Sequence, residues 1–385
     1  MDHPWSSQQF RDGARAAGRG ETVIAAAEAA AAAIKRVHPD LPVILTLKHL
    51  AHLSGVPVDD LQIVIFRQED PYRVFRVKKR GTPNSIAAPP RRFRTICVPS
   101  VTIMRVQRWI AQNVLNVIAP HPASFAFAPK RDLVGAARKH LEAKWLVKMD
   151  VRHFFESISE RQVYFVFRSL GYGALLSFQL ARLCTRRSKH LTFDPRISRG
   201  RGKSGLPYRR LVQGALPQGA PTSPMLANLV MRKFDERVEK LASQAGWTYT
   251  RYADDLAFSR RDQSDRDTAI QLTRQIEREL GREGLKNNRL KTSIAPPGSR
   301  KIVLGLLVDR EKPRLTREFR DNIETHLYAL LSPKIGVSKH LAKRGFASTI
   351  GMRRHIEGLI AFAHQVDKMY GAALYQSLNS IDWNS

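Results

Sequence analysis

The stretch that decides the fold is Tyr249-Thr-Arg-Tyr-Ala-Asp254-Asp255-Leu-Ala-Phe258-Ser. The residues on both sides of the aspartates are typical of β-strands, so the pattern predicts a hairpin connected at Asp254 and Asp255. Two-residue hairpin connections favour Asn or Gly, because the backbone there needs a positive φ. An Asp-Asp pair breaks that rule and sets two like charges side by side, which a bound cation would neutralise. A solvated acidic turn without a ligand is the alternative interpretation.

A second carboxylate follows another strand-like run, Trp145-Leu-Val-Lys-Met-Asp150. Such a run reads as a buried strand, and a charge at its end needs a partner. If this strand lies beside the hairpin, three carboxylates meet at one edge of a sheet. Carboxylate oxygens suit Mg²⁺ or Mn²⁺, and two ions about 3.5–4 Å apart clamp both oxygens of an in-line displacement. The pattern therefore predicts nucleotidyl transfer with two metal ions, Mg²⁺ or alternatively Mn²⁺.

The charge of the chain points to a polyanionic partner. Its 385 residues include 64 Lys+Arg and 34 Asp+Glu, a formal net charge of +30. Nucleic acid is the default partner because neutralised phosphates release counterions, and an anionic membrane surface is the alternative on charge alone. The two cysteines, Cys97 and Cys184, exclude a disulfide framework and a Cys-based zinc cluster. The scarcity of cysteines fits a reducing cytosol, and no run of residues is apolar for long enough to span a bilayer, so we expect a cytoplasmic protein without a membrane partner.

The order of patterns along the chain indicates an α+β fold with a compact sheet rather than a repeating βαβ ladder. Helical spacing occurs at residues 43–66, at about 100–118, and from about 314 to the end. Alternation typical of strands occurs at 71–98. Residues 1–42 predict an appended arm with an alanine-rich helix, either a solvated extension or a helix that docks RNA or a partner.

In this order the motifs resemble those of reverse transcriptases, and of the bacterial retron type in particular, over roughly residues 45–375. The motifs are Met149-Asp150-Val-Arg-His-Phe154-Phe155, Leu216-Pro-Gln218-Gly219-Ala-Pro-Thr-Ser-Pro224, Tyr252-Ala-Asp-Asp255, Leu290-Lys291-Thr292 and Val303-Leu304-Gly305. The resemblance implies a right-hand polymerase fold with fingers, a palm built on a small antiparallel sheet, and a helical thumb. The implied boundaries are arm 1–42, fingers with N-terminal helices 43–145, palm 146–310 with an interleaved fingers segment at about 169–212, and thumb 311–385.

The resemblance also implies roles for single residues. Asp150 and Asp254 would hold both metal ions, with Asp255 in support and the Val151 carbonyl contributing. Phe155 would fill the space that a ribose 2′-OH needs, although an ordinary core aromatic is the alternative. Lys291 would be the general acid, although a surface lysine is the alternative. The residues that would contact the nucleotide are Gln218, Gly219, Arg94, Lys78 and Lys79. Those that would contact primer and template are Tyr252, His140, Val303, Leu304 and Gly305.

Two motifs depart from the retron pattern in regions thought to recognise the cognate RNA. The Asn-Ala-x-x-His motif reads Ala136-Ala-Arg-Lys-His140 here, and Val-Thr-Gly reads Val303-Leu304-Gly305. The resemblance implies a structured non-coding RNA as template and primer, an RNA–DNA hybrid product, dNTP substrates, and an effector protein from the same operon in anti-phage defence. A non-retron defence-associated or group II intron-like reverse transcriptase is the nearest alternative. Alternatives of other classes are a catalytically silent RNA-binding scaffold and an RNA-synthesising polymerase, which Ala253 and Phe155 oppose.

Overall fold

A computed structural model describes residues 5–78, 93–187, 214–262 and 264–383. The helices are α1 (Ser7–Ala16), α2 (Glu21–Val37), α3 (Leu47–Ser54), α4 (Val58–Ile65), α5 (Val101–Ile110), the π-helical η1 (Ala111–Leu115), α6 (Leu133–Arg138), α7 (Phe154–Ser157), α8 (Glu160–Ser169), α9 (Ala174–Cys184), α11 (Ser223–Val230), α12 (Arg232–Gln244), α13 (Arg266–Arg282), the 3₁₀ turn η2 (Arg289–Lys291), α14 (Arg317–Leu331), α15 (Gly336–Arg344), α16 (Thr349–Val366) and α17 (Lys368–Asn379). The strands are β1 (Tyr72–Lys78), β2 (Phe93–Pro99), β3 (Trp145–Asp150), β4 (Arg186–Arg187), β5 (Gly214–Ala215), β6 (Thr248–Tyr252), β7 (Asp255–Arg260), β8 (Ser293–Ala295), β9 (Ile302–Val303), β10 (Leu306–Leu307) and β11 (Arg314–Leu315).

The chain forms two compact units, each assembled from three separate segments. Unit 1 comprises Met1–Pro129, Asp150–Val238 and Ile276–Asn288, and unit 2 comprises Lys130–Met149, Glu239–Gln275 and Arg289–Ser385. This grouping differs from the linear boundaries expected from the sequence. In particular, residues 130–145, expected in the fingers, group with the strands of the sheet and with the C-terminal helices.

The sheet that carries the aspartates has four strands in the order β6-β7-β3-β8. Strands β6 and β7 pair antiparallel, as do β3 and β8. The amide of Lys144, just before β3, donates to the carbonyl of Arg260, the last residue of β7, at 2.9 Å. The start of β3 therefore meets the end of β7, and these neighbours also run antiparallel. The predicted small antiparallel sheet is confirmed.

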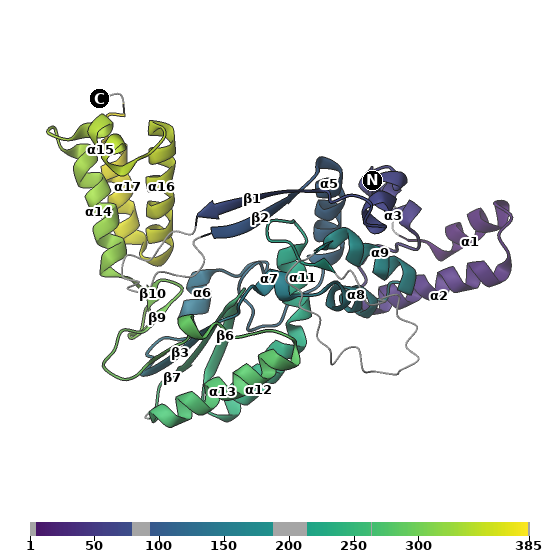
Figure 1. Ribbon diagram of the computed structural model, residues 1–385, viewed down its shortest axis with the longest axis horizontal. Coiled ribbons are helices and arrows are strands. Elements are labelled where there is room, and N and C mark those ends of the chain that lie inside the picture. Colours follow the sequence, from purple (N-terminus) through teal and green to yellow (C-terminus); the bar gives the residue numbers. More distant parts are fainter. Residues whose placement is uncertain (1–4, 79–92, 188–213, 263, 384–385) are drawn as a thin grey trace. The chain divides into compact units, whose positions relative to one another are not determined.

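The C-terminal helices of unit 2 share one hydrophobic core with the sheet. Figure 1 shows α14, α16 and α17 side by side, and α15 packs on α14 and α16. The core joins Leu146 and Ala257 of the sheet to Ile323 and Ile356 of the helices. Local N-cap residues mark the start of α14 and α16. The Thr316 and Ser348 side chains accept hydrogen bonds from the backbone amides of Phe319 and Gly351. The predicted helical C-terminal region is confirmed.

In unit 1 the predicted helical region 43–66 is two helices rather than one. Gly55 takes a left-handed conformation, φ 63°, at the C-cap of α3, which a residue with a side chain rarely adopts. Pro57 then precedes α4 at its N-cap, where the missing amide hydrogen matters little. These two residues redirect the chain between α3 and α4, which pack against each other.

The N-terminal arm is packed against the rest of unit 1. Helix α2 buries Ile24, Ala31 and Ile34, each 1% exposed. A Cβ added to Gly171 would lie 2.8 Å from the backbone of Ala33, so α2 comes close to this glycine. Ordered contacts of this kind contradict the interpretation of α2 as a solvated extension. Among the described helices, none combines the length and apolar character needed to cross a bilayer.

A buried ionic cluster holds the start of β5 in place. Glu160, the first residue of α8, is 0% exposed, and its carboxylate lies 2.5 Å from Arg67 Nη2 and 2.7 Å from Arg182 Nε. The Thr185 hydroxyl donates to the same carboxylate at 2.9 Å, and the Gly214 amide at 3.2 Å. A Cβ at Gly214 would lie 2.6 Å from Glu160 Oε2, so only glycine fits beside the carboxylate. The cluster thus ties α8, α9 and β5 to Arg67, the second residue after α4.

Candidate active site

The two aspartates lie on the β6–β7 hairpin, but the turn is one residue earlier than predicted. Tyr252 pairs with Asp255, so the connecting residues are Ala253 and Asp254. Ala253, and not Asp254, has a positive φ of 56°. The expectation that Asp-Asp occupies the turn was therefore wrong, because Asp255 already has strand geometry. The strained position belongs to Ala253, where glycine would be favoured.

Buried polar side chains support this hairpin. Arg251 is 0% exposed and donates through Nη1 to the Ala253 carbonyl at 3.3 Å. His140 is also 0% exposed, and its two ring nitrogens lie 2.7 Å from the hydroxyls of Ser259 and Thr250. His140 therefore joins the segment before β3 to both strands of the hairpin. This burial opposes the predicted contact of His140 with primer or template, because neither nitrogen reaches the surface.

We expect His140→Gln to reduce the pH dependence of stability. Burial lowers the pKa of His140 to about 3, whereas an unfolded histidine titrates near 6.5. As the pH falls below about 6.5 only the unfolded state gains this proton, so stability is lost towards pH 3 at up to about 1.4 kcal/mol per pH unit. Urea unfolding from pH 7 to pH 5 should show a shallower slope for His140→Gln than for the wild type. The exposed His52, changed to Gln, is the control, and equal slopes for both variants would contradict the prediction.

Asp150 ends β3 and is held in place by a neighbouring segment. The Asn288 amide donates to the Asp150 carbonyl at 2.7 Å, and Asn288 Nδ2 donates to Asp150 Oδ1 at 2.8 Å. Val151, 1% exposed, forms an isolated antiparallel bridge with Asn287. Because β3 and β7 are antiparallel neighbours, the last residue of β3 and Asp255, the first residue of β7, belong to the same end of the sheet.

Phe155 belongs to the short helix α7 and is only partly buried. Its ring makes an edge contact with Phe154, with centroids 5.4 Å apart, and a tilted contact with Phe127 at 6.4 Å. Phe127 is 50% exposed and has a φ of 58°. Two aromatic neighbours therefore restrict the position of the Phe155 ring without enclosing it, which leaves part of its surface for a ligand.

The segment with Gln218 and Gly219 is hydrogen-bonded on both sides within unit 1. The Leu216 amide donates to the Ile158 carbonyl at 3.1 Å, just after α7. The Cys97 amide of β2 donates to the Gln218 carbonyl at 2.8 Å. Gly219 has a φ of 113°, and an added Cβ would lie 3.1 Å from the Cys97 carbonyl. The segment thus connects the region of Phe155 to the β1–β2 ribbon, and Gly219 is needed for this approach.

The predicted basic residues of the fingers lie at the far end of this ribbon. Arg94 is exposed and pairs with Val77, and Lys78 pairs with Phe93. The side chain of Lys78, the whole of Lys79 and most of the interleaved segment 169–212 lie outside the described residues.

The other candidates belong to unit 2. Lys291 is an exposed residue of η2, and Tyr252 is half-buried at the end of β6. Val303 is buried at the end of β9. Leu304 and Gly305 form the β9–β10 turn with φ values of 49° and 84°. A leucine with positive φ is strained, so this turn has the backbone geometry that glycine and asparagine prefer.

Sequence reasoning missed several residues that support the candidate site. Arg251 stands inside a strand-like run, and a charge there is a signal that could have been used. Asn288 lies 138 residues from Asp150 in sequence, and Phe127 is in an irregular segment. No local pattern relates these two residues to the aspartates or to Phe155.

An antiparallel sheet with aspartates at one end, beside a helical C-terminal region, is typical of template-directed nucleic-acid polymerases. A protein-family model described as reverse transcriptase (RNA-dependent DNA polymerase) matches residues 77–308. The retron Ec86 reverse transcriptase of Escherichia coli is 30% identical over 334 residues, 86% of this chain and 92% of that protein. Two Myxococcus xanthus proteins are similar as well. The retron Mx162 reverse transcriptase is 30% identical over 302 residues, 75% of this chain and 58% of that protein. The retron Mx65 reverse transcriptase is 28% identical over 341 residues, 85% of this chain and 70% of that protein.

The chain therefore belongs to the reverse transcriptases, and among them to the bacterial retron type. Its activity is RNA-directed DNA polymerisation, with RNA as the template. Divalent metal ions are the general cofactors of this family.

Proposed function

We propose that the protein reverse transcribes a structured non-coding RNA into single-stranded DNA, with metal ions held by Asp150, Asp254 and Asp255. The observation that carries the proposal is the sheet itself. Strand β3 ends at Asp150, and its antiparallel neighbour β7 begins at Asp255, so carboxylates of separate motifs belong to one end of the same sheet. The other parts of the proposal concern the metal ions, the sugar of the nucleotide and the RNA.

The three carboxylates suit Mg²⁺ better than a metal ion that takes all of its ligands from protein side chains. Among the described residues, no group of three or more His, Cys, Asp or Glu side chains is gathered closely enough to hold an ion alone. Mg²⁺ usually takes one or two carboxylates, waters and substrate phosphates. Asp150 and Asp254 would be the main ligands, with Asp255 and the Val151 carbonyl in support, for two ions. Bound ions would neutralise the charge that develops on the attacking and leaving oxygens.

The chain's own residues would position the reactants. Asn288 orients the Asp150 carboxylate at 2.8 Å, and Arg251 restrains the turn that carries Asp254 through its bond to the Ala253 carbonyl. Gln218 and Gly219 lie in the segment hydrogen-bonded to β2, where they would line the nucleotide pocket. Lys291 would supply the proton to the leaving pyrophosphate.

Phe155→Ala should weaken the preference for deoxyribonucleotides. The Phe155 ring, restrained by Phe154 and Phe127, would fill the space that a 2′-OH needs. Removing a steric block of this size changes discrimination at least about ten-fold. The measurement is the ratio of kcat/KM for dGTP and GTP on one primer–template. Phe165→Ala, which truncates an aromatic residue of α8 that is 46% exposed, is the matched control. Unchanged sugar selectivity in Phe155→Ala would return Phe155 to an ordinary packing role.

We also propose that this RNA provides the primer, through the 2′-OH of an internal guanosine, so that RNA and DNA remain joined. The excess of 64 Lys+Arg over 34 Asp+Glu supports a large RNA partner. An effector protein encoded beside the enzyme, and a role in anti-phage defence, complete the proposal. The buried His140 would stabilise the β6–β7 hairpin rather than contact this RNA. Other residues would then recognise the RNA.

The test is to express the protein with its native flanking DNA, purify it, and analyse the bound nucleic acid with and without RNase. The expected result is a discrete, RNase-resistant DNA joined to RNA that is absent from the Asp254→Asn/Asp255→Asn protein. RNA alone, or DNA of mixed lengths, would favour a non-retron defence enzyme that uses another primer. Phage plating on cells with and without the intact locus would test the defence role separately.

A further inference from the structure

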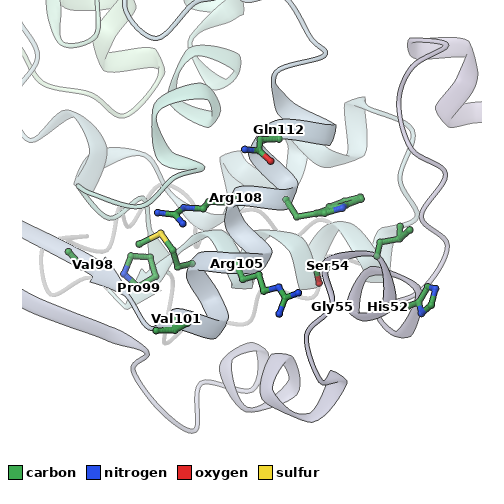
Figure 2. A pocket seen from close by; sticks show the side chains of 12 residues that line it. His52, Ser54, Gly55, Val98, Pro99, Val101, Arg105, Arg108 and Gln112 are labelled. Carbon is green, nitrogen blue, oxygen red and sulfur yellow. The ribbon is translucent and has the colours of Figure 1, made fainter. Parts of the chain in front are cut away.

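A hollow of unit 1 that the polymerase chemistry does not use lies between α3 and α5. Its volume is about 880 Å³, and it is open to solvent. Figure 2 shows His52, Ser54 and Gly55 on one side and Val101, Arg105 and Arg108 of α5 on the other. The size is within the range of small-molecule and nucleotide sites. The residues that line it contain no Asp or Glu.

The lining residues of α5 form one continuous face of the helix. They are Val101, Met104, Arg105, Arg108 and Trp109, and with Gln112 of η1 they recur with helical spacing. The core of unit 1 is contacted by a different face, with Ile103, Val106 and Ile110 each 1% exposed or less. Packing therefore does not explain the cationic and aromatic residues on the second face. The helix then continues into the π-helical turn η1, a distortion frequent at functional sites.

The two arginines of this face are available for an anion. Arg105 and Arg108 are exposed, and neither forms an ion pair with any residue in the described part of the chain. The Arg105 guanidinium lies directly over Gly55, because a Cβ there would be 2.8 Å from Nη2 and 3.2 Å from Cζ. Because Gly55, the C-cap of α3, has no side chain, the Arg105 guanidinium can lie at the rim of the hollow. Trp109 is half-buried beside them, with an apolar surface facing the hollow.

We propose that this hollow is a second nucleic-acid site, which binds an unpaired segment of the RNA outside the polymerase centre. One base stacks on Trp109, and the adjoining phosphates bind Arg105 and Arg108. Aromatic stacking with flanking guanidinium groups is the usual chemistry for single strands, because it uses the exposed face of an unstacked base. A duplex keeps its bases stacked and offers only phosphates, so it would not use Trp109. The inference rests on the proposed function only in taking RNA as the ligand.

The test measures binding of a short fluorescent oligouridylate to the full-length Asp254→Asn/Asp255→Asn protein, which removes synthesis from the readout. Each phosphate contact on a single strand adds about 0.7 to the slope of log K against log salt. Arg105→Gln with Arg108→Gln should therefore lower that slope by about 1.4 between about 50 and 200 mM salt. The control is Arg274→Gln with Arg278→Gln, two exposed arginines of α13 that remove the same charge. Equal slopes for the two double variants would overturn the proposal.

Substitutions of Trp109 provide a second, independent test of the proposed site. Trp109→Leu should weaken oligouridylate binding roughly ten-fold or more, whereas Trp109→Phe should retain most of it. Annealing the probe to oligoadenylate should abolish the difference between these variants. If duplex and single strand depend equally on Trp109, or if Phe is no better than Leu, the base-stacking site is wrong. Primer extension by the wild-type protein is scored separately, so a failed polymerase assay and a failed binding site give different results.

Discussion

Replacing Asp254 and Asp255 together by asparagine should abolish DNA synthesis while RNA binding persists. The amides keep the shape of the side chains but remove two negative charges, so the hairpin would no longer attract metal ions. A bound metal contributes several kcal/mol of transition-state stabilisation, which at about 1.4 kcal/mol per decade is at least a thousandfold in rate. The fold should survive, because Asp255 is exposed and Asp254 only partly buried. Binding to phosphates depends on basic residues elsewhere.

The matched control is another adjacent pair, Asp59 and Asp60 in the first turn of α4, changed to asparagine in the same way. Single-nucleotide extension of a primer on an RNA template gives the rate, and salt-dependent RNA binding gives the affinity. The control should extend the primer at close to the wild-type rate. Primer extension by Asp254→Asn/Asp255→Asn at a rate comparable to the control would remove the hairpin from the catalytic centre.

Glu160→Gln should be the most destabilising of the conservative substitutions considered. Its carboxylate is fully buried and contacts two guanidinium groups, Arg67 at 2.5 Å and Arg182 at 2.7 Å. Removing one partner of a buried ion pair leaves the other charge without compensation, at about 3–5 kcal/mol. The neutral amide also presents hydrogens towards donors such as Thr185 and Gly214. Because Gly214 leads into the segment with Gln218, we also expect a raised KM for dNTPs.

An exposed pair with similar geometry provides the comparison for Glu160. Arg353 and Glu357 of α16 lie 2.9 Å apart with their side chains 52% and 39% exposed. Glu357→Gln should therefore change the free energy of unfolding by no more than about 1 kcal/mol. Urea denaturation of both variants at neutral pH measures the difference. Similar losses for the buried and the exposed glutamate would contradict the role assigned to the cluster.

The sequence was sufficient for the strand and hairpin that carry the aspartates, because their patterns are local. The apolar run to Asp150 and the β-rich residues around Asp254 predict strands, and the structure has strands at both. The exact turn was missed, because Ala253 carries the positive φ that the pattern had assigned to aspartate. The break between α3 and α4 was signalled by Gly55 and Pro57 and should have been predicted.

Features assembled from distant residues were beyond local pattern analysis. The cluster around Glu160 brings together residues as far apart as Arg67 and Gly214, and no spacing in the sequence relates them. His140 differs from these residues, because its position in a motif was noticed but its surroundings could not be predicted. Its motif suggested RNA contact, but whether a histidine faces solvent or two hydroxyls depends on packing, which a motif does not encode. Asn288, the hydrogen-bond partner of Asp150, was missed for the same reason.

The interleaving of the two units constrains how the protein can fold during synthesis. Unit 1 is incomplete until Ile276–Asn288 has been made, and unit 2 needs the chain through its last segment, Arg289–Ser385. At the usual translation rates of about 5–20 residues per second, synthesis of the first 288 residues takes roughly 15–60 s, and until then part of the apolar surface of unit 1 stays uncovered. Its long-range pairings also make folding intrinsically slow. A nascent chain stalled before residue 276 should consequently be sensitive to protease and bound by chaperones, whereas a folded chain that contains both complete units should not.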